Sequence, residues 1–192
     1  MTSAAAPPAA DAAARRSLRA RLRAGPVARA IAEVDVRLYR LVRQHGHDAA
    51  IERPVRRFSR LGEHAAIWVA LGLAGAAVDR TRRDSWLRAT RAVLLAYALN
   101  TLLKTVVRRR RPQLEKLPAL ISTPTSLSFP SAHASSSFAA ARAFARLVPG
   151  APLYAVATAM ALSRVYLGVH YPSDVAAGAL LGTLVGASGG RG

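Results

Sequence analysis

The sequence contains no cysteine, which excludes disulfide bonds and a thiolate metal site. Acidic residues are also scarce: the chain of 192 residues has 10 of them, against 28 lysines and arginines. After Glu115, the only carboxylate side chain is that of Asp174. A single carboxylate in the last 77 residues cannot supply the oxygen cage that a divalent cation would need there. We therefore expect a protein without a metal ion or any other cofactor.

Lysine is almost absent, because only Lys104 and Lys116 accompany the many arginines. The formal net charge is +18, yet 52% of the residues are hydrophobic. Strong positive charge alone would suggest a nucleic-acid partner. The arginines, however, gather between long apolar runs, which is typical of a membrane protein with basic loops. We expect contacts with membrane lipids and none with nucleic acid.

The basic N-terminal part of the chain divides into two segments. Residues 1–26 are rich in alanine, proline and then arginine, and we expect a disordered tail without the pattern of a signal peptide. Residues 27–62 are expected to form an amphipathic interfacial segment. Its apolar side chains at helical spacing are Val27, Ile31, Val34, Leu38, Leu41 and Val42. This pattern fits a helix on the membrane surface, and a solvated helix packed on the bundle is the alternative.

Residues 63–188 form the predicted membrane-embedded domain. Its five apolar segments cover residues 64–78, 91–107, 133–149, 151–168 and 173–188. Each is at or slightly below the roughly 17–25 residues that a spanning helix needs. The sequence thus predicts an all-α fold, a polytopic membrane helix bundle of about five spans with an N-terminal amphipathic interfacial helix. A short loop at 79–90 and a longer one at 108–132 are expected between spans.

Three polar stretches flank these spans: KTVVRRRRP at 104–112, PSAH at 130–133 and SRVYLGVHYPSD at 163–174. Polar groups beside spans are costly, so they are candidates for function. In an up-and-down bundle, the exit of the second span, the entry of the third and the turn between the last two lie at one face. The side chains expected to converge there are Lys104, Arg111, His133, Arg164, His170 and Asp174.

The chemistry of this cluster indicates a phosphate site. Two arginines and a lysine beside a helix N-terminus can hold phosphate, because their N–H groups and those of the helix all donate hydrogen bonds. The two histidines suggest a nucleophile and an acid–base group. A carboxylate four residues after His170 can fix the tautomer of that histidine and stabilise its cationic form.

The same stretches resemble the pattern of the type 2 phosphatidic acid phosphatase superfamily, which is K-x6-R-P, P-S-G-H and S-R-x5-H-x3-D. Every spacing holds, and the resemblance covers about residues 60–188. Ala132 stands where the family has glycine, but alanine retains the backbone N–H that the family uses for phosphate. The resemblance implies a helical membrane enzyme that hydrolyses a phosphate monoester.

The resemblance also implies a role for each matching residue. His170 resembles the nucleophile, which forms a phosphohistidine, and Asp174 resembles its partner. His133 resembles the general acid that protonates the leaving alkoxide and then helps water attack. The residues that resemble phosphate ligands are Lys104, Arg111, Ser131, Ala132 and Arg164.

Other polar residues near the predicted site have two interpretations. Glu63 and His64 are candidates for head-group contacts, or they form an interfacial cap of the first span. Asn100 is a further candidate for the site, or it joins two helices by a hydrogen bond. We interpret Arg108, Arg109 and Arg110 as a charge run that flanks the membrane.

The amino-acid sequence around these motifs suggests the substrate. The stretches FSRLGEH and STPTSLSFPSAHASS are similar to those of actinobacterial decaprenylphosphoryl-5-phosphoribose phosphatases, which act in arabinan precursor synthesis. Undecaprenyl pyrophosphate, phosphatidylglycerol phosphate and phosphatidic acid are the alternative lipid-phosphate substrates. The spans disfavour a vanadium haloperoxidase, which shares the pocket, and the complete set of catalytic positions disfavours a non-enzymatic binder of anionic lipid.

The distribution of arginine predicts sidedness. Residues 15–60 contain 13 arginines, against five in residues 80–91. Five spans would put the basic segment and the active site on one face, and the positive-inside rule assigns that face to the cytoplasm. A sixth span hidden in residues 27–44 would reverse the assignment. The sequence makes no prediction of the oligomeric state.

Overall fold

The chain folds into helices joined by loops, and the computed structural model describes residues 25–46 and 48–189. The helices are α2 (Pro26–His45), α3 (Ala49–Leu61), α4 (Ala66–Val78), α5 (Arg83–Val107), α6 (Ala132–Phe144), α7 (Gly150–Tyr166) and α8 (Pro172–Ser188), with short 3-10 turns η1 (Glu63–Ala65) and η2 (Arg80–Arg82). The described residues contain isolated β-bridges but no strand, so the all-α prediction is confirmed. The predicted tail, residues 1–26, lies almost wholly outside these residues.

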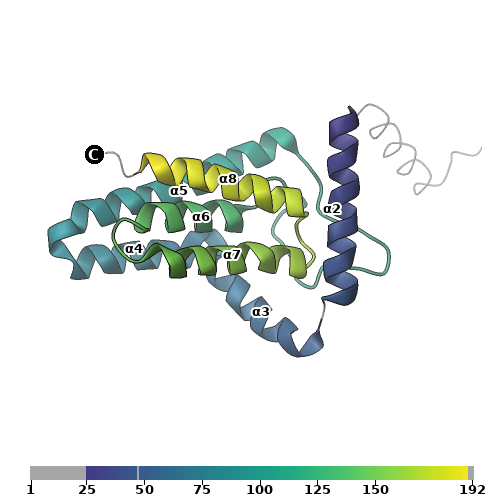
Figure 1. Ribbon diagram of the computed structural model, residues 1–192, viewed down its shortest axis with the longest axis horizontal. Helices are drawn as coiled ribbons and strands as arrows, with labels where there is room; N and C mark the ends of the chain where they lie inside the picture. The colour runs from purple at the N-terminus through teal and green to yellow at the C-terminus, as the bar shows by residue number, and fades with distance from the viewer. Residues whose placement is uncertain (1–24, 47, 190–192) are drawn as a thin grey trace, which may run out of the picture.

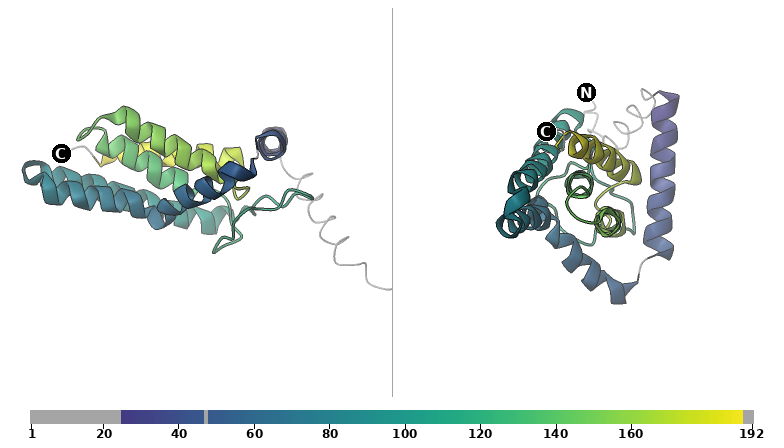
Figure 2. Two further views of the ribbon diagram at one scale, coloured as in Figure 1. Left: turned by 90° about the horizontal axis from the view of Figure 1, so that it is seen from below. Right: turned by 60° about the vertical axis from the view of Figure 1, so that its left-hand side comes forward.

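Helices α4 to α8 form an elongated bundle, and α2 crosses one end of it (Figure 1). The central helix is α6, which packs against α5, α7 and α8, as the view along the bundle in Figure 2 shows. The chain leaves α5 and α7, and enters α6 and α8, at the end where α2 lies, which we call the α2 end. The predicted convergence of the three polar stretches therefore has a structural basis.

Glycines let α8 approach the backbone of α6. Gly178, Gly182 and Gly186 recur every fourth residue and face the α6 side. A Cβ atom at Gly182 would lie 2.1 Å from the carbonyl oxygen of Ser135. This stripe of small residues is the packing that lipid-embedded helices use, because close backbones increase van der Waals contact.

The helices differ in whether they are long and apolar enough to cross a membrane. Within the described residues, one helix, Arg80–Val107, is long and apolar enough to cross a membrane by itself. The bent pair Ala49–Leu61 and Glu63–Val78 could supply a second crossing. Helix α6 has 13 residues and α8 has 17, which correspond to roughly 20 and 26 Å against a hydrocarbon core of about 30 Å. The number of five spans stays a prediction.

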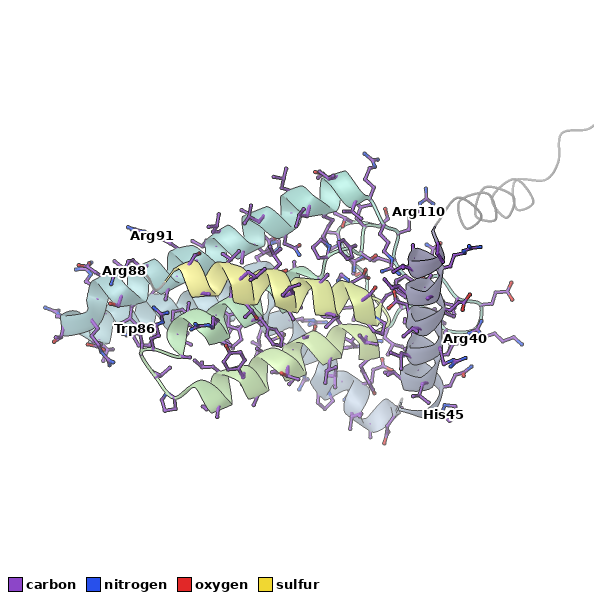
Figure 3. The ribbon with its side chains drawn as sticks, turned by 45° about the horizontal axis from the view of Figure 1, so that its top comes forward. Arg40, His45, Trp86, Arg88, Arg91 and Arg110 are labelled. Carbon is purple, nitrogen blue, oxygen red and sulfur yellow. The ribbon has the colours of Figure 1, made fainter. Side chains whose placement is uncertain are left out.

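The loop predicted at 79–90 is shorter than expected, because residues 83–90 belong to α5. The carboxylate of Asp79 accepts hydrogen bonds from the backbone N–H of Arg82 (3.2 Å) and from Nε1 of Trp86 (3.2 Å), so it organises the start of this helix. Figure 3 labels Trp86, Arg88 and Arg91 at the end of the bundle away from α2, and Arg40 and Arg110 at the α2 end. Both ends thus carry arginine.

Helix α2 packs on the bundle through polar side chains. Asp35, Tyr39 and Arg43 recur every fourth residue and are buried. The Tyr39 hydroxyl donates to the carbonyl oxygens of Leu117 (3.2 Å) and Gly168 (3.3 Å), whereas Arg43 donates to that of Pro118 (2.8 Å). The apolar residues exposed on α2 are Val27, Ile31, Val34, Leu38 and Leu41. The helix is therefore packed on the bundle, as the alternative interpretation required, while its apolar face points away from the protein.

Candidate active site

A cavity of about 560 Å³ opens at the α2 end of the bundle. The predicted site residues that line it are Glu63, His64, Asn100, Lys104, Arg111, Ala132, His133, Arg164 and His170. Ser131 and Asp174 are fully buried and do not line it. A larger groove of about 830 Å³ runs along α2 but contains none of the predicted catalytic residues.

Three cationic side chains reach this cavity from three different elements. Lys104 comes from the last turn of α5, and its Nζ lies 3.4 Å from the carbonyl oxygen of Leu127. Arg164 comes from the last turn of α7 and is buried. Arg111 comes from the loop after α5, and burial lowers the pKa of its guanidinium to about 10, so it is still a cation at neutral pH. Such a group of cations suits a phosphate dianion.

His170 lies at the base of the cavity and is 2% exposed. Its Nε2 is 3.2 Å from Nη1 of Arg111. Because a guanidinium only donates, Nε2 must accept, which assigns the proton of the neutral ring to Nδ1. Burial, followed by the charges of Arg111 and Arg164, holds the pKa of His170 well below its ordinary value. The ring is therefore neutral at physiological pH, with the Nε2 lone pair directed at Arg111.

Asp174 stands behind His170, with its Oδ2 3.6 Å from Nδ1 of the histidine. That distance is longer than a hydrogen bond, but it places the carboxylate next to the proton of Nδ1. The same Oδ2 accepts from the backbone N–H of Tyr171 (2.8 Å), which is half of a capping box at the start of α8. Asp174 thus serves both the helix and the histidine.

The turn that delivers His170 depends on a glycine. Gly168 has φ +76°, in the left-handed region that favours glycine. The N–H of Gly168 bonds to the carbonyl of Val165 (3.0 Å), and that of Val169 bonds to the carbonyl of Arg164 (3.1 Å). This is a Schellman motif, which ends α7 and brings His170 beside Arg164. Gly168 thus ends α7 and begins the turn that holds His170.

His133 stands in the first turn of α6, with its Nε2 3.0 Å from the carbonyl oxygen of Ser59. The hydroxyl of Ser59 accepts from Nη1 of Arg164 at 2.5 Å. One buried serine in α3 therefore holds both the predicted acid and a predicted phosphate ligand. Ser59 was absent from the predicted site, since a serine between arginines gives no chemical pattern.

Ser131 and Ala132 begin α6 beside the cavity. The backbone N–H of Ser131 donates to the carbonyl of Asp174 (3.0 Å), so it is not free for a ligand. Ala132 lines the cavity and is the first residue of the helix. The first N–H groups of a helix have no partner within it, so the N–H at Ala132 suits an anion better than that of Ser131.

The rim of the cavity includes a strained turn. His64 and Ala65 both have left-handed backbones, with φ 52° and 61°. Such conformations cost roughly 1–3 kcal/mol each in residues other than glycine, and they cluster at ligand sites. The turn exposes Glu63 and His64, and Nδ1 of His64 lies 2.9 Å from the Tyr97 hydroxyl. Glu63 and His64 are therefore at the rim, where a head group could reach them.

Asn100 both lines the site and joins two helices. It lines the cavity, and its Nδ2 donates to the Ser135 hydroxyl at 2.9 Å, which joins α5 to α6. Within residues 25–46 and 48–189, no group bonds to its buried Oδ1. The side chain can therefore accept one more hydrogen bond inside the site.

The interpretation of Arg109 as part of a flanking charge run is wrong. Its Nη1 donates to Oδ1 of Asp174 (2.9 Å) and its Nη2 to Oδ2 of Asp35 on α2 (2.7 Å). The neighbours Arg108 and Arg110 are exposed. A run of four arginines conceals this difference, because position in the run does not reveal which one turns inward.

Comparisons with known proteins agree with this geometry. The PAP2 superfamily pattern matches residues 85–188. A decaprenylphosphoryl-5-phosphoribose phosphatase of Mycobacterium tuberculosis is 46% identical over 145 residues, which cover 72% of this chain and 81% of that protein. A phosphatase of the same name from Mycolicibacterium smegmatis is 48% identical over 124 residues, 64% of this chain and 68% of that one.

Two solved structures share the fold. The crystal structure of Aquifex aeolicus LpxE superposes with a TM-score of 0.70 at 24% identity and covers 81% of this chain and 94% of that one. A transmembrane PAP2-type phosphatidylglycerolphosphate phosphatase of Bacillus subtilis gives a TM-score of 0.67 at 23% identity, over 83% and 84%. At this identity the likeness concerns the fold alone. With the family pattern over residues 85–188 and a relative at 46% identity, the chain belongs to the PAP2 superfamily and is a membrane lipid phosphatase.

Proposed function

We propose that this phosphatase hydrolyses a phosphate monoester of a polyprenyl-linked substrate through a phosphohistidine on His170. The observation that carries the proposal is the cavity in which Lys104, Arg111 and Arg164 surround a buried, neutral His170. Three cations can offset the charge of a phosphate dianion and of the transition state that follows it. The neutral imidazole beside them is the nucleophile that such a reaction needs.

In the first step, Nε2 of His170 attacks phosphorus, and the bond from phosphorus to the leaving oxygen breaks. His133 gives its proton to that oxygen, so the alcohol leaves neutral. In the structure, Arg111 donates to Nε2 at 3.2 Å. We propose that it turns to the phosphate when the attack begins. Asp174 stabilises the positive charge that develops on the imidazole.

In the second step, water attacks the phosphohistidine and releases inorganic phosphate. His133, having lost its proton, accepts one from the attacking water, and the phosphorus–nitrogen bond breaks. The electron pair returns to Nε2 of His170, which restores the starting state. Within the described residues, no three histidine, aspartate or glutamate side chains form a metal-binding group, and we propose that turnover persists in excess EDTA.

For the substrate, we propose decaprenylphosphoryl-5-phosphoribose, an arabinan precursor. Relatives that carry this substrate in their names are 46% and 48% identical to the chain. Such a lipid has a diester that joins prenol to sugar and a terminal 5-phosphate monoester. The three cations suit the dianionic monoester, and Glu63 and His64 at the rim offer polar contacts to a ribose. The expected product is the lipid-linked ribose without its 5-phosphate.

For the membrane, we propose five spans, α4 to α8, with α2 in the interface. Support comes from exposed apolar side chains on the outside of the bundle, such as Leu94, Leu102 and Leu184. Support also comes from α2, which crosses the end of the bundle and exposes its apolar face. A helix with this orientation can lie in the headgroup region rather than cross it.

The proposed substrate is tested by competition. Purified protein in detergent receives phosphoribosyl lipid and phosphatidic acid at equal concentration, and released products are measured. We expect the higher kcat/KM for the phosphoribosyl lipid. His170→Ala should lower turnover of both lipids by at least about 10⁴-fold, and vanadate should inhibit the unaltered protein.

The matched control is His45→Ala, at an exposed histidine on α2, which should retain activity. If phosphatidic acid has the higher kcat/KM, the arabinan assignment is wrong and the general lipid phosphatase remains. If His170→Ala turns over normally, the phosphohistidine mechanism is wrong. Bromide oxidation on added vanadate, without phosphate release, would instead indicate a haloperoxidase.

A further inference from the structure

An acidic residue far from the family pattern contacts the catalytic end of the bundle. Asp35 lies on α2, outside residues 85–188 that match the family, and is 2% exposed. Its Oδ1 accepts from the backbone N–H of Ser173 at 2.8 Å, and its Oδ2 accepts from the Ser173 hydroxyl at 2.5 Å. Ser173 directly precedes Asp174, so this contact holds the residue next to the proposed partner of His170.

Arg109 connects this carboxylate with the catalytic one. One nitrogen of its guanidinium donates to Asp35 (2.7 Å), and the other donates to Asp174 (2.9 Å). The planar fork of arginine has two edges that can engage two carboxylates at once, which lysine lacks. The guanidinium also lies 4.3 Å from the centre of the Tyr171 ring, which further fixes its plane.

The charges of Asp35, Arg109 and Asp174 determine how strongly Asp174 can stabilise positive charge on the His170 imidazole. A single pair of Arg109 and Asp174 would be neutral, and the carboxylate would lose much of its effect on the imidazole. A second carboxylate on the other side of the guanidinium leaves the three groups with one net negative charge. Because Asp35 and Asp174 are almost fully buried, water screens these charges little.

We infer that Asp35 is a positioning residue of the phosphatase: through Arg109 it orients the Asp174 carboxylate and keeps its negative charge available to His170. The inference rests on the proposed function of His170 as nucleophile. It makes the interfacial helix α2 a part of the catalytic apparatus, although α2 contributes no side chain to the reacting atoms.

A merely structural role of Asp35 makes a different prediction. Tyr39 on the same face of α2 also anchors the helix, by hydrogen bonds to Leu117 and Gly168. If anchoring were the whole role of Asp35, Tyr39→Phe and Asp35→Asn would lower activity alike. If Asp35 acts through Arg109, only Asp35→Asn should change catalysis strongly.

The test measures kcat, KM and the vanadate inhibition constant of purified full-length variants, with the lipid phosphate that the unaltered protein hydrolyses fastest. For Asp35→Asn we expect kcat to fall by about 10-fold or more, which is the effect of weakening one buried charged partner. KM should stay within about twofold, because Lys104, Arg111 and Arg164 are untouched, whereas vanadate, as an analogue of the transition state, should bind more weakly roughly in proportion to the loss of kcat. Glu33→Gln, at an exposed carboxylate of the same helix, should leave all three values unchanged.

A double-mutant cycle identifies the route. Asp35→Asn combined with Arg109→Gln should be no slower than Arg109→Gln alone, because the inferred effect of Asp35 on Asp174 passes through the guanidinium and the asparagine can still accept from Ser173. Arg109→Lys, which retains charge but cannot bridge both carboxylates, should lose kcat as well. Thermal unfolding and the phosphoenzyme yield per mole of protein separate a loss of kcat from a loss of folded protein.

Three results would overturn the inference: unaltered kcat in Asp35→Asn, an equal loss in Tyr39→Phe, or multiplicative losses in the double mutant. A fall of kcat that follows only the folded fraction would overturn it too. These outcomes leave the proposed function intact. Failure of the unaltered protein to release phosphate from any lipid, or normal turnover of His170→Ala, would instead overturn the proposed function and the inference with it.

Discussion

The reactivity of His170 is set by the charges that face it. Arg111, Arg164 and Lys104 are cations in the same cavity, and the carboxylate of Asp174 lies behind the ring, 3.6 Å from its Nδ1. Protonation of the ring would add a further positive charge to a buried site that already holds three. The neutral ring is therefore favoured, and the proposed nucleophile needs no base to deprotonate it.

This electrostatic argument predicts the pH dependence of turnover. A neutral His170 and a protonated His133 are needed together, so kcat/KM should follow a bell-shaped profile. Because the pKa of His170 is lowered by burial and by the nearby cations, the ring stays neutral below the ordinary value of about 6.5. Measured from pH 4.5 to 9, the acid limb should lie below about pH 6.5, after allowance for the substrate phosphate, which ionises near pH 6.

A variant distinguishes the titration of His170 from that of the substrate phosphate in this pH profile. Arg111→Gln removes one cation, so the acid limb should move to higher pH in the residual activity. The ionisation of the substrate is the same in both proteins, and Arg57→Gln, at an exposed arginine of α3, should not move the limb. A rate that climbs steadily from pH 5 to 9 would contradict the assignment.

The sequence predicts the catalytic set at this scale but not its supports. Lys104, Arg111 and His170 could be found because phosphate chemistry requires cations and a nucleophile, and because their spacing resembles the family pattern. Ser59 acts partly through its backbone carbonyl, which any residue possesses. Asp35 is 138 residues from the residue that it contacts, and such a pairing has no local pattern. Its burial against Ser173 and Arg109 is visible only once the polar face of α2 is known to point toward the bundle.

At the scale of elements, apolar runs predict where helices lie, whereas polar contacts determine where they begin and end. Helix α2 occupies residues 26–45 and so contains the whole predicted apolar pattern from Val27 to Val42. Helix α5 begins earlier than its apolar run, because Asp79 bonds to Arg82 and Trp86. Helix α6 ends at Phe144, although the apolar run continues to residue 149.

The contact between α6 and α8 can be tested at one glycine. Gly182→Ala would place a Cβ atom 2.1 Å from the carbonyl oxygen of Ser135, so one helix must move. Overpacking of this kind typically costs about 1–3 kcal/mol of the free energy of unfolding. We expect a lower thermal unfolding midpoint in detergent. We also expect a lower kcat, since α6 carries His133 and α8 carries Asp174.

A larger substitution on the outside of the same helix is the control. Ala176 is exposed on α8, and Ala176→Leu should leave both the unfolding midpoint and kcat close to those of the unaltered protein. If Gly182→Ala were as stable and as active as this control, the close approach of the two backbones would not be a determinant of the site.

At the scale of the whole molecule, the basic N-terminal segment and the active site meet at one end. Helix α2 crosses that end, where its Asp35 contacts the first turn of α8 and its Tyr39 and Arg43 contact loops beside the predicted catalytic residues. The opposite end holds the turn between α4 and α5, with Arg88 and Arg91 nearby (Figure 3). The positive-inside rule compares these two ends, and the α2 end has the larger share of arginine in the sequence.

The absence of cysteine allows this orientation to be tested by labelling single introduced cysteines. Ser126 is exposed in the loop at the α2 end, and Thr81 is exposed in the turn at the opposite end. If the active site faces the cytoplasm, a membrane-impermeant thiol reagent applied to whole cells should label Thr81→Cys and leave Ser126→Cys unlabelled until the cells are opened. A cytoplasmic site would also place the enzyme where phosphorylated sugar donors are made. Strong labelling of Ser126→Cys in intact cells, with protection of Thr81→Cys, would reverse the orientation, and the positive-inside argument from residues 15–60 would then be wrong.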